Sequence, residues 1–78
     1  PVIRQLRSHA DAIREQEVER TLRKLGHLDE RDREVVRALG AAITNKLLHA
    51  PVTHLKQSSD PTSSAKAATD LFGLEEEV

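Results

Sequence analysis

The apolar residues of this chain recur every three or four positions, which is the spacing of one face of an α-helix. Strands favour β-branched and aromatic residues. Here only 1% of the residues are aromatic, and the sequence is rich in Ala, Leu, Arg and Glu, which are good helix formers. We therefore predict an all-α fold, organised as one domain over residues 1–78.

A long first helix is predicted over residues 2–25, with Pro1 at its start, where a missing N–H costs nothing. Its apolar residues form two groups, whose centres lie about 110° apart on a helical wheel. Either the two groups pack against different partners, or they belong to one broad stripe. Gly26 is predicted to close this helix in the left-handed conformation, and Asp29 to cap the next one.

A second helix is predicted over residues 30–49, and its apolar side chains fall on one broad face: Val35, Val36, Leu39, Ala42, Ile43 and Leu47. Pro51 has no N–H for the carbonyl of Leu47, so the helix should be kinked or broken there. Residues 51–56 would then form a further short turn. Leu48 lies off the stripe and needs its own cover, either from the segment after Pro51, where Leu55 could supply it, or from another molecule.

The stretch QSSDPTSS, residues 57–64, is predicted to be a mobile loop because Ser, Asp and Pro favour turns. A short C-terminal helix is expected over residues 65–72, ending at Gly73. Leu71, Phe72 and Leu74 form an apolar cluster that should tie this end of the chain to a core. An acidic run follows at residues 75–77.

The small size of the chain favours a partner. A domain of 78 residues buries only about 60 to 65% of its unfolded surface, and without cysteine it has no disulfide to compensate. We expect two copies to form a dimeric helical bundle. The candidates for the core or the dimer interface are Ile3, Leu6, Ala10, Ile13, Val36, Leu39, Ile43, Leu47, Leu48, Leu55, Leu71, Phe72 and Leu74.

The charge pattern argues against nucleic acid as the default partner, because 12 basic and 13 acidic residues are mixed along the chain. Most should pair on helix surfaces, as Glu19 would with Arg23. Arg20, Arg23 and Lys24 leave direct contact with tRNA as a weaker possibility. No apolar run approaches 18 residues and no signal peptide is evident, so we expect a soluble intracellular protein without a membrane segment. Without methionine, and with Pro1 first, the sequence reads as a domain excised from a larger protein.

Side chains that could carry chemistry are few. His49 and His54 lie five residues apart with a proline between them, which is not the spacing of a helical metal site. The serines cluster in the predicted loop, and no cysteine could act as a nucleophile. We therefore assign no catalytic, cofactor-binding or metal residue, and expect no enzymatic activity from these residues alone.

Three segments carry a resemblance to a known family: HADAIREQEVERTLRKLGHL, VRALGAAITNKLLHAPVTHLK and LFGLEEE. In this order they resemble the C-terminal dimerisation domain of glutamyl-tRNA reductase. The resemblance implies a parent enzyme that uses NADPH to reduce tRNA-bound glutamate to glutamate 1-semialdehyde, in the synthesis of tetrapyrroles such as haem and chlorophyll. It would be cytoplasmic in bacteria and plastidic in a plant. None of the family's catalytic or NADPH-binding segments is among these residues.

What the resemblance implies for this domain is a role in assembly, with a second copy of the chain as its partner. The alternative is a docking module for a regulatory protein, since the family's plant members are bound there by a helical-repeat regulator. The same exposed leucines would serve either role.

Overall fold

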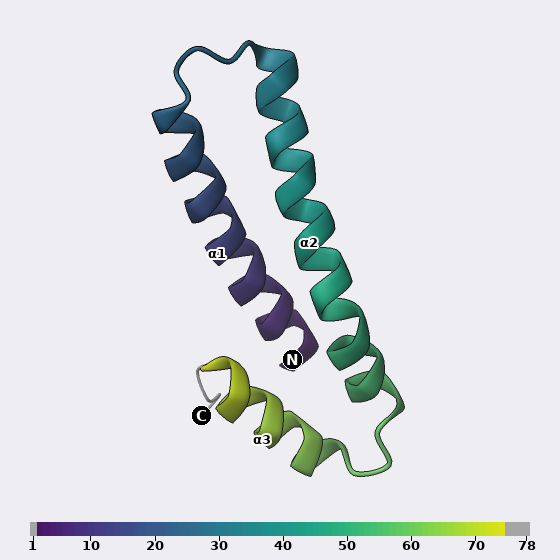
Figure 1. The fold of residues 1–78 in the computed structure, drawn as a ribbon. Helices are drawn as coiled ribbons and strands as arrows, with labels where there is room; N and C mark the ends of the chain where they lie inside the picture. The colour runs from purple at the N-terminus through teal and green to yellow at the C-terminus, as the bar shows by residue number, and fades with distance from the viewer. Residues whose placement is uncertain (1, 75–78) are drawn as a thin grey trace.

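Three helices make up residues 2–74, the part of the chain that the computed structural model describes: α1 (Val2–Lys24), α2 (Glu30–Gln57) and α3 (Pro61–Phe72). Helices α1 and α2 run antiparallel as a hairpin, and α3 lies across its open end, beside the start of α1 (Figure 1). Residues 2–74 contain no strand. The all-α prediction is confirmed, whereas Pro1 and the acidic run at 75–77 lie outside the described residues.

The connection between α1 and α2 is a tight turn. The amide of Leu25 donates to the carbonyl of Leu22 at 3.1 Å, and that of Leu28 donates to Leu25 at 3.2 Å. The predicted left-handed cap at Gly26 is wrong, because Gly73 is the only described residue with positive φ. Asp29 caps α2 as predicted, since its carboxylate accepts from the amide of Asp32 at 2.9 Å.

Helix α2 is not broken at Pro51 but continues to Gln57. The predicted end at His49, followed by a separate turn, is therefore wrong. A proline inside a helix costs about 3 kcal/mol, because one hydrogen bond is lost and the ring crowds the preceding turn. Here the last two turns of α2 bring Val52 and Leu55 against the core, and this burial offsets the cost of the proline.

Helix α3 begins four residues earlier than predicted, at Pro61 instead of Ala65. Asp60 caps it by accepting a hydrogen bond from the amide of Ser63 at 3.3 Å, and Pro61 fills the first helical position. Residues 58–60 alone therefore separate α2 from α3, so the extent predicted for the loop, 57–64, is wrong. The predicted end of α3 at Gly73 is confirmed by its left-handed φ of 65°.

The hydrophobic core is small and lies where the three helices meet. Leu6 and Leu48 are buried together with Leu74, which follows α3 and closes the cluster. Val2, Ala10, Val52 and Leu55 pack against it. Leu74 thus supplies the cover that Leu48 was expected to need, with Leu55 beside it. Towards the other end of the hairpin, Leu22 is fully buried.

The middle of the hairpin depends on a glycine. A Cβ atom at Gly40 would lie 2.8 Å from Val18 Cγ2 and 3.2 Å from Arg14 Cγ, distances that side-chain carbons do not tolerate without rearrangement. One turn later, the Thr44 hydroxyl donates to the Gly40 carbonyl at 3.0 Å and so satisfies its own buried oxygen. Small groups on α2 therefore let α1 approach closely.

Candidate functional site

A stripe of large apolar side chains on α2 faces away from the core. Val35, Leu39, Ile43 and Leu47 follow one another at four-residue spacing, and they are 64%, 60%, 51% and 71% exposed. Four such side chains in a continuous row are an unusual surface for a protein that acts alone. We call this row the α2 stripe.

An apolar groove adjoins the α2 stripe. It has a volume of about 820 Å³ and lies between α1 and α2, with the end of α3 as its third wall. Ile43 and Leu47 belong to both surfaces, whereas Ile13 comes from α1 and Leu71 and Phe72 from α3. Its polar lining comes chiefly from His9, Arg14 and Glu17, together with Thr44. The groove is therefore predominantly apolar, with a few polar side chains in its lining.

The residues predicted for core or interface separate into two sets. Leu6, Leu48 and Leu74 form the core, with Ala10 and Leu55 against it, while Ile3 and Val36 are partly buried. The exposed set consists of Ile13, Leu39, Ile43, Leu47, Leu71 and Phe72. Val35 belongs with this second set, although it was not among the candidates. Its place on the apolar face of the helical wheel was the signal for it.

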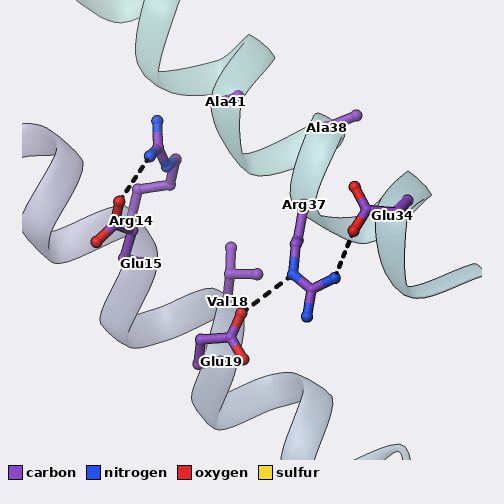
Figure 2. Close-up of a pocket in the computed structure, with 8 residues that line it drawn as sticks. All are labelled: Arg14, Glu15, Val18, Glu19, Glu34, Arg37, Ala38 and Ala41. Carbon is purple, nitrogen blue, oxygen red and sulfur yellow. Dashed lines mark hydrogen bonds and ion pairs between the residues drawn. The ribbon is translucent and has the colours of Figure 1, made fainter. Parts of the chain in front are cut away.

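Charged side chains bridge α1 and α2 away from the groove. Arg37 contacts Glu34 of its own helix at 2.6 Å and reaches across to Glu19 of α1 at 3.2 Å (Figure 2). It also lies 3.3 Å from Glu30. Hydrogen bonds to Glu19 and then to Glu34 raise the pKa of Arg37 above its ordinary value. The guanidinium thus bridges the two helices, and Glu19 contacts Arg37 instead of Arg23, its predicted partner.

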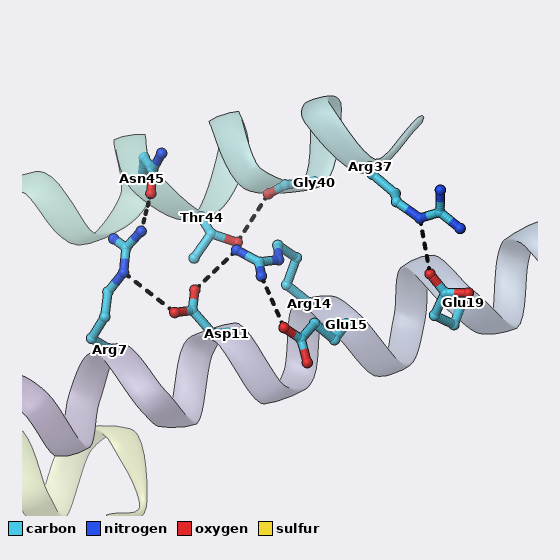
Figure 3. Close-up of polar contacts among 9 residues, drawn as sticks. All are labelled: Arg7, Asp11, Arg14, Glu15, Glu19, Arg37, Gly40, Thr44 and Asn45. Atoms are coloured by element: carbon cyan, nitrogen blue, oxygen red, sulfur yellow. Dashed lines mark hydrogen bonds and ion pairs between the residues drawn. The ribbon is translucent and has the colours of Figure 1, made fainter. Parts of the chain in front are cut away.

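A second polar group lies nearer the start of α1. Asp11 accepts from Arg14 at 3.0 Å and lies 3.5 Å from Arg7, and Arg7 also donates to Asn45 of α2 (Figure 3). These carboxylates and guanidiniums pair with one another, so their role is to stabilise the fold and not to bind a substrate. The surface suited to a partner is the apolar one.

Comparison with known proteins identifies the family. The model of the glutamyl-tRNAGlu reductase dimerisation domain matches residues 1–74. The chain belongs to this dimerisation-domain family. Its whole length is 48% identical to "Glutamyl-tRNA reductase 2" of Anaeromyxobacter dehalogenans, and 48% identical to the glutamyl-tRNA reductases of Herpetosiphon aurantiacus and Myxococcus xanthus.

The match to these reductases is confined to one part of each. The chain covers 18% of the Anaeromyxobacter protein and 19% of each of the other two, so it spans about a fifth of the length of these curated relatives. No solved structure matches the chain significantly. The resemblance drawn from the three sequence segments is thus confirmed for the family.

In this dimerisation domain the histidines form no metal cluster. Within residues 2–74, no three His, Cys, Asp or Glu side chains are placed so that they could hold a metal ion together. His49 and His54 are both exposed on α2. None of the helices in residues 2–74 is long and apolar enough to cross a membrane.

Proposed function

We propose that this chain joins two copies of a glutamyl-tRNA reductase, with the α2 stripe and the apolar groove as the joining surface. The observation that carries the proposal is that α2 turns its small residues toward α1 and exposes its large apolar side chains. The small residues Gly40 and Thr44 face α1, whereas the large side chains from Val35 to Leu47 face outward. A second copy would remove this apolar surface from water, which is the main driving force of association.

The activity of the parent enzyme is a proposal that rests on the names of the relatives. The reduction of glutamyl-tRNA to glutamate 1-semialdehyde, with NADPH as reductant, would be performed by segments outside this chain. Those segments would also bind the tRNA. This domain would act by holding two catalytic arms in a fixed relation. Cytoplasmic localisation remains a prediction of the same kind.

Replacing both Leu39 and Ile43 by Asp tests the proposed surface. Because both side chains are exposed in the single chain, the change removes little from its core but would place four carboxylates in the dimer. We expect the dimer dissociation constant to rise at least about a hundredfold. Sedimentation velocity over a dilution series measures it. The control replaces Ala12, which is exposed on α1, by Asp and should leave the dimer intact.

Two outcomes would count against the proposal. If the unsubstituted chain stays monomeric at millimolar concentration, the proposed joining role is wrong, and the alternative, docking of a regulatory protein in the groove, is favoured. A dimer that survives Leu39→Asp and Ile43→Asp with unchanged affinity would place the joining surface elsewhere on the chain.

A further inference from the structure

We infer that the two copies pack α2 against α2 in antiparallel orientation, with the twofold axis at Leu39. This inference rests on the proposed function, because it specifies how the α2 stripe meets its own copy. In this register Leu39 contacts the Leu39 of the second copy, and Val35 lies opposite Ile43. The contact of Val35 with Ile43 then occurs twice, once on each side of the axis, as an isologous interface requires.

The evidence for this register is the pair of charges on the exposed face of α2. At 100° per residue, the face within about 60° of the stripe's centre carries one acidic residue, Asp32, and one basic residue, Lys46. Both are exposed. Neither takes part in any of the ion pairs found within residues 2–74. Each is therefore available to a partner.

The positions of the two charges fix both orientation and register. Asp32 lies seven residues before Leu39, and Lys46 lies seven residues after it. An antiparallel pair centred on Leu39 therefore places Asp32 of each copy opposite Lys46 of the other. A parallel pair in register would instead oppose Asp32 to Asp32 and Lys46 to Lys46, and like charges facing each other oppose association.

Neighbouring antiparallel registers lose this match. An axis midway between Leu39 and Ile43 places Lys46 opposite Val36, so that an ammonium group faces an apolar side chain. An axis at Ile43 places Asp32 opposite His54 and leaves Lys46 opposite Gly40, without a carboxylate. Charge pairs at helix interfaces commonly select one register among several. The axis midway between Leu39 and Ile43 pairs all four stripe residues with one another, whereas the axis at Leu39 places Leu47 opposite Arg31, so the charges and not the apolar contacts decide for it. Among these, the axis at Leu39 joins the acid to the base.

Single cysteines test the register cleanly, because the chain has no cysteine of its own. With Leu39→Cys, mild oxidation should link most of the dimer covalently. Val35→Cys and Ile43→Cys should each fail to link alone, since the two copies of either cysteine would lie about two helical turns apart. An equimolar mixture of these two variants should link. Non-reducing electrophoresis reads the products, and sedimentation confirms that every variant is dimeric before oxidation.

The outcomes separate this inference from the proposed function. If Ile43→Cys links with itself, or if all three variants do so alone, then the axis is elsewhere or the helices are parallel, while the dimer itself stands. A dimer in which neither Leu39→Cys nor the mixture links also overturns the register. A chain that sediments as a monomer overturns both proposals.

Reversing the charges gives an independent test. Asp32→Lys should raise the dimer dissociation constant about tenfold, because two attractive pairs become repulsive. Adding Lys46→Asp should restore it to within about threefold of the parent value, although the unfavourable lysine remains in the first turn of α2. If the double variant recovers no affinity, then Asp32 and Lys46 do not face each other and the register is wrong.

Discussion

At the scale of single residues, the contact between α1 and α2 depends on what Gly40 lacks. The backbone of Gly40 does not have a positive φ, yet a Cβ atom there would lie 2.8 Å from Val18 Cγ2. A glycine inside a helical pattern is destabilising relative to alanine, so its presence in the middle of a long helix signals a close approach. The sequence offered that signal, but not the identity of the helix that approaches.

Gly40→Val should therefore destabilise the fold. Two methyl groups cannot enter the space beside Val18 and Arg14 without separating the helices, and such overpacking costs about 2 kcal/mol. Denaturant unfolding followed by circular dichroism measures the change. Gly26→Val is the matched control, because nothing lies within 4 Å of a Cβ atom there and its φ is not positive. A Gly40→Val variant as stable as this control would show that the helices separate without cost.

At the scale of elements, local sequence rules predicted the helix boundaries that capping residues determine, and failed for the boundary that tertiary packing determines. The start of α2 after Asp29 and the end of α3 at Gly73 follow from capping chemistry, and both were predicted. Asp60 followed by Pro61 is an equally local signal for the start of α3 that was read as a loop. The path of α2 through Pro51 depends instead on Val52 and Leu55 packing against the core cluster, two of whose members, Leu6 and Leu74, are distant in sequence.

The cost of this continuous helix can be measured with Pro51→Ala. The alanine restores an N–H and removes a clash worth about 3 kcal/mol, while the groove loses part of one wall, so we expect a gain of about 1 to 3 kcal/mol in unfolding free energy. Pro61→Ala is the control, because proline at the first helical position costs nothing. A loss of stability in Pro51→Ala would mean that the ring's own contacts outweigh the missing hydrogen bond.

At the scale of the whole molecule, residues 2–74 bury few large side chains and expose many. Leu6 and Leu22 are fully buried, whereas seven large apolar side chains, from Ile13 to Phe72, are at least 38% exposed. The helical wheels identified these residues but could not separate the core from the surface. The sequence alone does not show which of two apolar helix faces packs within the chain. That preference comes from the close fit of Gly40 against Val18 and Arg14 of α1.

This imbalance predicts that stability depends on concentration. If two copies cover each other's apolar surface, folding and association are coupled, and the melting temperature should rise by several degrees for each hundredfold increase in chain concentration. Scanning calorimetry at several concentrations measures this. The Leu39→Asp and Ile43→Asp double variant should lose the dependence. A parent chain with one melting temperature at every concentration would contradict coupled folding.

The position of Leu74 has a practical consequence. Because Leu74 belongs to the core cluster and Val2 packs against it, these two residues lie together at one end of a molecule that is 50 Å long. The exposed turn at Gly26 and His27 occupies the other end (Figure 1). A fluorescent label or an affinity tag spliced into that turn would stand far from Val2 and Leu74, and so should leave the core cluster that they share undisturbed.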